Sequence, residues 1–329
     1  MKLAKCGVSF QVISWIESFL TGRSQRVVVD GHKSAKADVT SGVPQGSVIG
    51  PALFLFYIND MPTATDSDVR LFADDTIIYN SALNHRTLQD DLCKLEEWEE
   101  ENDMEFHPQK CEHILFSRKK HQQDNTYKLH NTTIPKSAAI KYLGVTLDDQ
   151  LTFRQHVKNV AAKANSSLGF VRRTVLTSST SVKSTAYTQI VRPVLEYASG
   201  SWDSIGKTAA ADLEAVQRRA ARVICGIRRT DRKTSTTGLL KGLNLPTLAE
   251  RRKSTRLKLF QHYHFDTTDN TIQTYLQPSI STPKRRHQYQ YMIPHSNTQH
   301  HQRSFFIKTA KEWNKLPDTS DFLRPPDRL

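Results

Sequence analysis

The chain of 329 residues is long enough for about two domains, and its 37% hydrophobic and 24% charged residues are ordinary for a soluble protein. The charge is divided unevenly, because residues 1–150 contain 16 Lys/Arg and 21 Asp/Glu, whereas residues 151–329 contain 30 Lys/Arg and 12 Asp/Glu. A half with a net charge of +18 predicts a polyanionic partner, most simply nucleic acid and, as the weaker alternative, an anionic membrane surface. The four cysteines are far apart and form no C-x-x-C pair, so neither a disulfide framework nor a zinc ribbon is indicated.

The first elements predicted are a helix and a hairpin. The opening MKLAKCGVSFQVISWIESFL is basic like a signal peptide, but Gln11 and Glu17 interrupt its apolar part. We therefore interpret it as an amphipathic helix with one apolar side, made of Val12, Trp15, Ile16 and Phe19. Residues 25–39 then predict two strands around the turn dipeptide Asp30-Gly31.

A glycine-rich loop follows in SGVPQGSVIGPALFLFYINDM, Ser41 to Met61. Gly42, Pro44 and Gly46 predict a tight loop, and the apolar run after it has the length of a buried helix with Ser47 as a candidate N-cap. This run, Val48 to Ile58, has 11 residues and is too short to cross a bilayer. The segment is therefore predicted to be a loop that leads into a buried helix.

The stretch LFADDTIIYN, Leu71 to Asn80, sets two adjacent aspartates between two short apolar runs. Strand-favouring residues on both sides, such as Val69 before the pair and Ile77 after it, predict a β-hairpin with the aspartates at its tip. For an isolated pair, an ordinary turn is a sufficient explanation, because Asp hydrogen-bonds nearby backbone and tolerates unusual φ and ψ angles. Only the motifs around the pair can favour a catalytic role.

An acidic helix is predicted next, from about Arg86 to Asp103, with Leu88, Leu92 and Leu95 at helical spacing. Its cluster of glutamates is interpreted as a solvated face, namely Glu96, Glu97, Glu99, Glu100 and Glu101. Residues 107–117 predict a loop and a strand, and residues 140–148 predict another strand that contains a glycine.

The pattern turns helical in the second half. Helices are predicted at about 156–173, 181–197, 209–225 and 247–262, the last beginning with Thr247 and Glu250 in capping-box spacing. Residues 267–303 are rich in Gln, His, Pro, Ser and Thr and predict a loosely ordered linker, after which a short helix at 305–315 docks back through Phe306, Ala310 and Trp313. Strands early and helices late indicate an α+β domain followed by a helical one. We expect domains at 1–150, 151–265 and 266–329.

Four motifs in this order carry a family resemblance: SGVPQGSVIGP, LFADD, Lys110 after an acidic helix, and KYLGV. Together they resemble the palm of a reverse transcriptase, and most of all the polymerase of non-LTR, LINE-type retrotransposons of the jockey-like kind. Flanking segments fit the same family, including SWIESFLTGRSQRVVV, IVRPVLEYASGSW, LEAVQRRAARVICG and EWNKLP. The resemblance covers most of the chain and implies an α+β polymerase palm remnant, an antiparallel sheet with helices, followed by an α-helical thumb and a C-terminal extension.

The resemblance gives the aspartate pair a chemical role. Nucleotidyl transfer uses two Mg²⁺ ions about 4 Å apart, and Mg²⁺ is typically bound by one or two carboxylates together with substrate phosphates. Asp74 corresponds to the principal metal ligand of the family and Asp75 to its acidic neighbour. A tight turn between strands also holds carboxylates rigidly, as such a site needs. The ordinary turn becomes the weaker alternative.

The other motifs have implied roles as well. Gly42, Val43, Pro44, Gln45 and Gly46 match the loop beside the incoming nucleotide and the template base, and Ala73 matches a position near the primer terminus. Lys110 matches a lysine that protonates the departing pyrophosphate as a general acid, with a solvated surface lysine as the alternative. Tyr142, Leu143 and Gly144 match the hairpin that holds the primer strand, called the primer grip, with a core strand as the alternative.

Basic residues on two predicted helices fit a thumb that follows the template–primer duplex. They are Arg218, Arg219 and Arg222 on one helix and Arg251 and Arg252 on the other. Such charges bind phosphates without reading sequence, although each residue has a solvated helix face as its alternative. The implied partners are an RNA template, a DNA primer and deoxynucleoside triphosphates, with no membrane and with no protein partner identified.

One motif of the family has no counterpart in the sequence. The family places a third carboxylate on a strand that would precede Met1, and its triphosphate-binding fingers would lie there too. Asp30 is not its substitute, because it belongs to the turn of a different hairpin. We therefore expect an N-terminally truncated RNA-directed DNA polymerase domain that is catalytically incomplete alone, in the nucleus or the cytoplasm by family. The alternative is a non-catalytic nucleic-acid-binding remnant or a pseudogene product.

Overall fold

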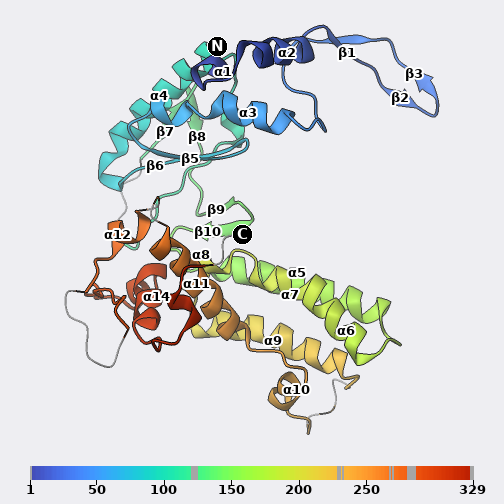
Figure 1. Cartoon of the computed structure of the whole chain (residues 1–329), viewed down its shortest axis with the longest axis vertical. Helices are drawn as coiled ribbons and strands as arrows, with labels where there is room; N and C mark the ends of the chain where they lie inside the picture. The colour runs from blue at the N-terminus through green and yellow to red at the C-terminus, as the bar shows by residue number, and fades with distance from the viewer. Residues whose placement is uncertain are drawn as a thin grey trace. The chain divides into compact units, whose positions relative to one another are not determined.

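The computed structural model in Figure 1 describes residues 2–119, 125–227, 231, 233–266, 268, 270–279 and 287–326. They fall into two units, the first made of residues 1–115 and 119–137 and the second of residues 116–118 and 138–329. Each unit combines helices with antiparallel strand pairs, and every sheet within the described residues has two strands. The α+β class expected from the sequence is confirmed in its coarse form, a mixture of helices and small antiparallel sheets.

The first unit begins with helices α1 (Lys2–Lys5) and α2 (Phe10–Leu20) and two nested strand pairs, β1 (Arg23–Gln25) with β4 (Ala37–Val39) and β2 (Val28–Val29) with β3 (His32–Lys33). The inner turn consists of Asp30 and Gly31, whose φ angles of 48° and 83° are both positive, as a type I′ hairpin requires. The predicted hairpin is confirmed. On α2, Ile16 is buried, whereas Trp15, expected on the same side, is 56% exposed.

The rest of the first unit alternates helices with hairpins. It contains α3 (Gly50–Ile58), β5 (Asp68–Phe72), β6 (Asp75–Tyr79), α4 (His85–Glu101), β7 (Tyr127–Leu129), β8 (Thr132–Ile134) and 3₁₀ turns at Met61–Ala64, Ala82–Asn84 and Pro108–Lys110. Hairpins β5–β6 and β7–β8 are both antiparallel. The strand expected within residues 107–117 is wrong, because that segment makes only an isolated bridge, between His113 and Lys136.

The core of the first unit lies between α3, α4 and these hairpins, and its buried members include Ile58, Met61, Leu92, Leu95, Trp98, Leu129 and Ile134. Leu92 and Leu95 confirm the helical spacing read from the sequence. The sequence predicted that the acidic face of α4 is solvated, but one member of the cluster is buried. Glu99 is only 3% exposed and accepts a hydrogen bond from the amide of Phe106. All four cysteines lie in the described part of the chain and are free thiols.

The second unit starts with the hairpin β9 (Ala139–Tyr142) and β10 (Val145–Asp148) and is otherwise helical. Its helices are α5 (Arg154–Thr174), α6 (Thr180–Ala186), α7 (Arg192–Glu196), α8 (Ser199–Trp202), α9 (Lys207–Ile224), α10 (Thr236–Gly242), α11 (Leu248–Phe265), α12 (Thr271–Tyr275), α13 (Gln299–Gln302) and α14 (Phe305–Trp313), and a 3₁₀ turn follows at Asp321–Leu323. The helix expected at 181–197 is divided by a π-helical turn, Tyr187–Val191, shortly before Pro193, which has no N–H for a regular ladder. The capping box of Thr247 and Glu250 is confirmed at the start of α11. None of the helices among the described residues is both long and apolar enough to cross a bilayer.

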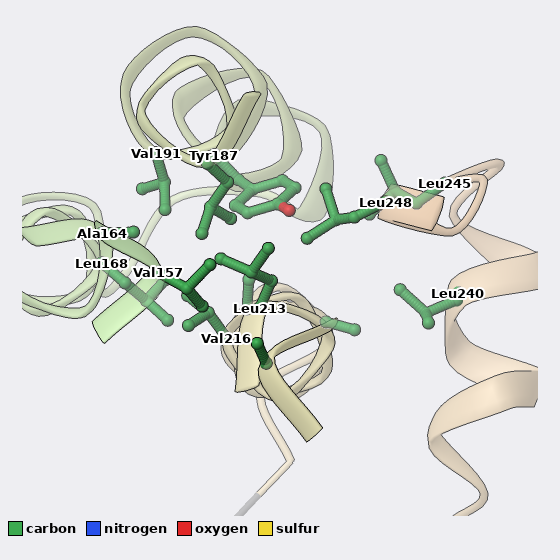
Figure 2. Close-up of a cluster of buried hydrophobic side chains, with 14 of the residues drawn as sticks. Val157, Ala164, Leu168, Tyr187, Val191, Leu213, Val216, Leu240, Leu245 and Leu248 are labelled. Atoms are coloured by element: carbon green, nitrogen blue, oxygen red, sulfur yellow. The ribbon is translucent and has the colours of Figure 1, made fainter. Parts of the chain in front are cut away.

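Figure 2 shows how the central core of the second unit is built from segments far apart in the sequence. Val157, Ala164 and Leu168 of α5 pack against Leu213 and Val216 of α9, and α5 and α9 run side by side in Figure 1. Tyr187 and Val191 from the π-helical turn lie over these residues in Figure 2. Leu240, Leu245 and Leu248 border the same cluster on the right of the picture. The hydroxyl of the buried Tyr187 donates to Gln217 at 2.8 Å, so the polar end of its ring has a partner.

A second cluster of the same unit corrects the predicted linker. Among the described residues of 267–303, Ile272, Leu276 and Tyr291 are buried and pack with Phe260 and Trp313. The segment is mostly polar, and the sequence therefore predicted little order in it. Its few apolar side chains nevertheless pack with those of α11 and α14. The closing helix docks as expected through Ala310 and Trp313, both 0% exposed.

Candidate active site

The aspartate pair lies at the tip of hairpin β5–β6, where Phe72 pairs with Asp75 and only Ala73 and Asp74 form the turn. Ala73 has a φ of 51°, and a positive φ at the first central residue is the mark of the primed turns that suit a hairpin. A residue with a Cβ adopts this conformation at a cost of roughly 1–2 kcal/mol. Ala73, Asp74 and Asp75 are all exposed. The predicted hairpin is confirmed, with its turn one residue earlier than the aspartate pair itself.

The start of β5, at the end of the hairpin away from the turn, is held by a buried carboxylate of α4. Asp91, 0% exposed, accepts hydrogen bonds from the backbone amides of Asp66 at 2.9 Å and Ser67 at 2.8 Å. Lys94, one turn along α4, pairs with both Asp66 and Asp91. Burial alone would raise the pKa of Asp91, but the hydrogen bonds from Ser67 and Asp66 outweigh it and hold the pKa below its ordinary value. The carboxylate therefore fixes the chain just before β5.

The glycine-rich loop contains a β-turn in which the amide of Ser47 donates to the carbonyl of Pro44 at 3.3 Å. Gly46, with a φ of 81°, takes the position of this turn that needs a positive φ, and Gln45 beside it is exposed. Helix α3 begins at Gly50, later than predicted, but the Ser47 hydroxyl still accepts from the Gly50 amide at 3.1 Å. A Cβ at Gly50 would lie 2.6 Å from that hydroxyl and 3.1 Å from the carbonyl oxygen of Pro44, so a larger residue there would displace the Ser47 side chain and crowd the turn.

Arg23 ties this loop to the end of α2. Its Nε donates to the carbonyl of Leu20 at 2.7 Å, and one terminal nitrogen donates to the carbonyls of Ser41 at 3.1 Å and Gly42 at 2.7 Å. A planar guanidinium can serve partners on two segments at once, and a cation is favourable beside the last carbonyls of a helix. Arg23 therefore positions the first residues of the loop.

Lys110 ends the 3₁₀ turn Pro108–Lys110 and is exposed. It belongs to the same unit as the aspartate pair and the glycine-rich loop, whereas residues 142–144 belong to the other unit. The general-acid role of Lys110 stays a prediction.

The hairpin β9–β10 turns at Leu143 and Gly144, whose φ angles of 43° and 81° are again both positive. Although the sequence placed this hairpin in the first region, 1–150, its contacts are with the helical unit. The amide of Thr146 donates to Nδ1 of His156 at 3.2 Å, and the Asp148 carboxylate accepts from the amide of Phe153 at 2.7 Å, just before α5 begins. The role of residues 142–144 at a primer stays a prediction.

The five arginines expected to follow a duplex differ in their surroundings. Arg218 and Arg219 on α9 are exposed, and Arg219 also donates to Asn165 of α5 at 2.8 Å. Arg222 is half-buried and donates to the carbonyls of Asp231 and Thr234. Exposed Arg218 and Arg219 are thus the members of this set with a surface position suited to phosphate.

Arg251 and Arg252 have partners within the second unit instead. Arg251 forms a two-pronged ion pair with Glu196. Arg252 is 2% exposed, and its Nε donates to the buried carboxylate of Asp203 at 2.7 Å. The expectation that Arg252 contacts a nucleic-acid backbone is corrected by this burial: one face of α11 packs inward, and its charges neutralise acidic groups of the core.

The aspartate pair fits the ligand chemistry of Mg²⁺. That ion prefers hard oxygen ligands and keeps several waters, so one or two protein carboxylates suffice when phosphates supply the rest. Asp74 and Asp75 offer adjacent, exposed carboxylates on a short turn. Within the described residues, no group of three or more His, Cys, Asp or Glu side chains lies close enough to hold a metal ion.

Residues that support the site were missed in the sequence. Arg23 stands directly after a predicted helix, where a cation often binds the last carbonyls, so its position was a usable signal. Asp91 gave no such signal, because it belongs to a helix rich in acidic residues and its partners are about 25 residues away.

Residues 2–147 match the protein family described as "Reverse transcriptase (RNA-dependent DNA polymerase)". The chain is 30% identical over 223 residues, 64% of its own length and 24% of the relative's, to the "Probable RNA-directed DNA polymerase from transposon X-element" of Drosophila melanogaster. It is 34% identical over 157 residues, 44% of its own length and 17% of the relative's, to the "RNA-directed DNA polymerase from mobile element jockey" of the same species. A similar alignment, 29% identical over 251 residues, covers 71% of the chain and 27% of the "Probable RNA-directed DNA polymerase from transposon BS" of that species. No solved structure matches the chain.

The matched region contains the glycine-rich loop, the aspartate hairpin and Lys110 together, which places it in the class of reverse transcriptases. The chain carries a reverse transcriptase region of the jockey-like, non-LTR retrotransposon kind. The resemblance read from the motifs is therefore confirmed. The aligned residues span between 17% and 27% of the length of these curated relatives.

Proposed function

We propose that the first unit forms part of the palm of an RNA-directed DNA polymerase and that hairpin β5–β6 carries its catalytic carboxylates. The observation behind this proposal is the turn of the hairpin, where Asp74 and Asp75 are exposed beside Ala73, whose φ is 51°. Residues held in sparsely populated backbone conformations cluster at active sites and ligand-binding turns. The family match over residues 2–147 supports the same function.

In this proposal Asp74 and Asp75 hold Mg²⁺ beside the incoming deoxynucleoside triphosphate. When bound there, Mg²⁺ would supply the activation of the primer 3′-hydroxyl and the charge neutralisation of the triphosphate. The loop from Gly42 to Gly46 orients the nucleotide and the template base, because its glycines allow the backbone to approach a ligand closely. Ala73 lies near the primer terminus, and Lys110 donates a proton to the departing pyrophosphate.

The second unit then serves as the thumb and holds the template–primer duplex. The net charge of +18 on residues 151–329 supports this role, as does the exposure of Arg218 and Arg219 on α9. Contacts of this kind are made to phosphates, so binding should show little sequence preference. We expect affinity for an RNA–DNA hybrid to fall by about 10³-fold or more between 50 and 200 mM salt, if about 6 phosphates are contacted.

The carboxylate assignment is tested by metal binding to the 329-residue chain, with Mn²⁺ as a paramagnetic substitute for Mg²⁺. We expect Mn²⁺ to broaden the amide signals of residues 73–76, and Asp74→Asn to weaken its affinity at least about tenfold. Asp68→Asn is the matched control, because Asp68 is an exposed aspartate of the same hairpin at the end away from the turn. An equal loss in both variants, or broadening elsewhere only, would contradict the assignment.

The same chain also decides between the two functions. Binding of a hybrid without any Mn²⁺ effect at the hairpin would favour the non-catalytic nucleic-acid-binding alternative. The expectation that the 329-residue chain alone does not extend a primer stays a prediction, and a primer-extension assay on an RNA template with Mg²⁺ tests it.

A further inference from the structure

The turn of hairpin β9–β10 is held by a residue that lies 54 positions further along the chain. The hydroxyl of Tyr197 donates a hydrogen bond to the carbonyl of Leu143 at 3.0 Å. Its ring lies directly against Gly144, where an added Cβ would come within 3.1 Å of the ring carbon Cε1. One side chain therefore contacts both residues of the turn.

This turn needs outside support. Leu143 has a φ of 43°, and a residue with a Cβ adopts such a left-handed conformation only at a cost. The amide of Thr146 donates to His156 of α5, and the Asp148 carboxylate accepts from the amide of Phe153, but neither bond reaches the turn itself. Tyr197 supplies the hydrogen bond at the turn.

Tyr197 is itself firmly placed, although the residue is 58% exposed. Its amide donates to the carbonyl of Pro193 at 2.9 Å at the end of α7, and its carbonyl accepts from the indole of Trp202 at 2.8 Å. Trp202 is 0% exposed, so the backbone of Tyr197 is tied to the core of the second unit. The exposed ring is thus directed at the turn by its backbone and its hydroxyl, because burial alone does not hold it.

We propose that Tyr197 is a positioning residue that sets the Leu143–Gly144 turn in the shape needed to hold the primer strand. This inference rests on the proposed function, because it takes residues 142–144 as the primer grip. It adds that the grip depends on the segment between α7 and α8 and therefore keeps its shape together with the helical unit. Tyr197 acts through the turn and touches no reacting atom.

The experiment compares Tyr197→Phe with Tyr275→Phe in the full 329-residue chain. Tyr197→Phe keeps the ring against Gly144 and removes only the hydroxyl, whereas Tyr275 is another exposed tyrosine of the same unit whose ring stacks on Phe306. A neutral hydrogen bond contributes about 1 kcal/mol, so we expect roughly fivefold faster amide exchange at Gly144 and Val145 in Tyr197→Phe. The affinity for an RNA template annealed to a DNA primer should fall by about two- to fivefold, because a smaller fraction of the chain has the turn formed. Tyr275→Phe should change neither value.

A second pair of variants tests the ring contact. Gly144 and Gly31 both have positive φ angles in hairpin turns, but a Cβ at Gly31 would meet nothing within 4 Å. Gly144→Ala should therefore weaken hybrid binding, whereas Gly31→Ala should leave it unchanged despite the same backbone strain.

Unchanged exchange at Gly144 and Val145 in Tyr197→Phe would overturn the proposal, and so would faster exchange with unaltered hybrid affinity. If the unaltered chain bound no hybrid, the proposed function of the second unit would fail. The exchange measurement would still decide separately whether Tyr197 sets the turn.

Discussion

The hairpins β5–β6 and β9–β10 are closed by turns of the same length but are supported at opposite ends. In β5–β6 the turn of Ala73 and Asp74 is exposed, and the carboxylate of Asp91 fixes the chain just before β5. In β9–β10 the turn of Leu143 and Gly144 is itself bound by Tyr197. Hairpin β5–β6 is thus fixed at its base and exposed at its turn, whereas the turn of β9–β10 is bound by a side chain from another segment.

This difference fits the roles proposed for the two hairpins. Carboxylates that hold Mg²⁺ must admit water and phosphate oxygens from several directions, which a turn packed against a neighbouring side chain would prevent. A turn that holds a strand of nucleic acid needs a fixed shape, because each ordering step left until binding reduces affinity. Two turns of equal length, with different backbone conformations, are thus suited to the two proposed roles by their different tertiary contacts.

The largest effect is expected from Asp203, which follows α8 a few residues after Tyr197. Its buried carboxylate binds Arg252 at 2.7 Å, Arg256 at 2.7 Å and Lys308 at 2.8 Å. Burial alone would raise the pKa of Asp203, but the charges of Lys308 and Arg256 hold it below the ordinary value. Asp203→Ala leaves the two buried arginines without this partner, which should destabilise the unit by about 3–5 kcal/mol in urea denaturation.

The comparison of the hairpins predicts which of them is loosened when Asp203 is removed. In Asp203→Ala, amide exchange should accelerate at Gly144 and Val145, because Tyr197 is held by the same segment, and should not change in β5–β6. Asp212→Ala is the control, since Asp212 is an exposed aspartate on α9. Equal acceleration in both hairpins would show that they do not depend on separate supports.

Asp91 tests the base of the first hairpin. Asp91→Asn keeps the volume but removes one of the two acceptors for the amides of Asp66 and Ser67, so we expect the first unit to lose about 1–3 kcal/mol. Its neighbour Asp90 is exposed, so Asp90→Asn should have little effect. Urea denaturation followed by the fluorescence of Trp98, which is buried in this unit, measures both.

The pH dependence of this contribution has a definite sign. The pKa of Asp91 is lowered in the folded chain from its ordinary value of 3.8, so the unfolded chain binds the proton more readily. The stabilisation is complete above pH 3.8 and is lost as the pH falls through the folded pKa. The difference between the unaltered chain and Asp91→Asn should therefore shrink below about pH 4. A difference that grew on acidification would contradict the assigned hydrogen bonds.

The sequence predicted the hairpin at Asp30-Gly31 and the hairpin at the aspartate pair because their signals are local, whereas β7–β8 was not predicted. Strand-forming residues flank the Asp74–Asp75 pair, and Asp30-Gly31 is a turn dipeptide whose two positive φ angles the structure confirms. The exact turn of β5–β6 was one residue earlier than the pair, because the pairing of Phe72 with Asp75 follows the register that buries Val69.

The supports of these hairpins could not be predicted, because they join residues distant in the chain. Tyr197 is 54 positions from Leu143, and Arg252 is 49 positions from Asp203. Nothing in the local pattern of α11 distinguishes the buried Arg252 from the exposed Lys253 beside it. A cluster of basic residues on one helix therefore predicts the charge of a surface without telling which of its members lies on that surface.

The smallest effect is expected from Arg23, which donates hydrogen bonds to the first residues of the glycine-rich loop. Arg23→Lys keeps the charge, but a single ammonium lacks the planar fork that reaches the carbonyls of Leu20, Ser41 and Gly42 together. We expect the unfolding free energy to change by about 1 kcal/mol or less, since these bonds are largely exposed. Amide exchange in residues 42–47 should nevertheless accelerate several-fold, roughly as the loss of one hydrogen bond allows.

Arg26→Lys is the matched control, because Arg26 is exposed and stands only three residues further along the chain. If both variants left the loop unchanged, the bonds of Arg23 would be incidental, and the hydrogen bond from Ser47 to Pro44 would be sufficient to shape the loop. If Arg23→Lys alone loosened residues 42–47 while β5–β6 kept its protection, the first unit would resemble the second in one respect. In each unit, a glycine-containing turn proposed to contact a ligand would then be shaped by one side chain distant in the sequence, Arg23 or Tyr197. The turn of Ala73 and Asp74 would differ from both, because it is exposed.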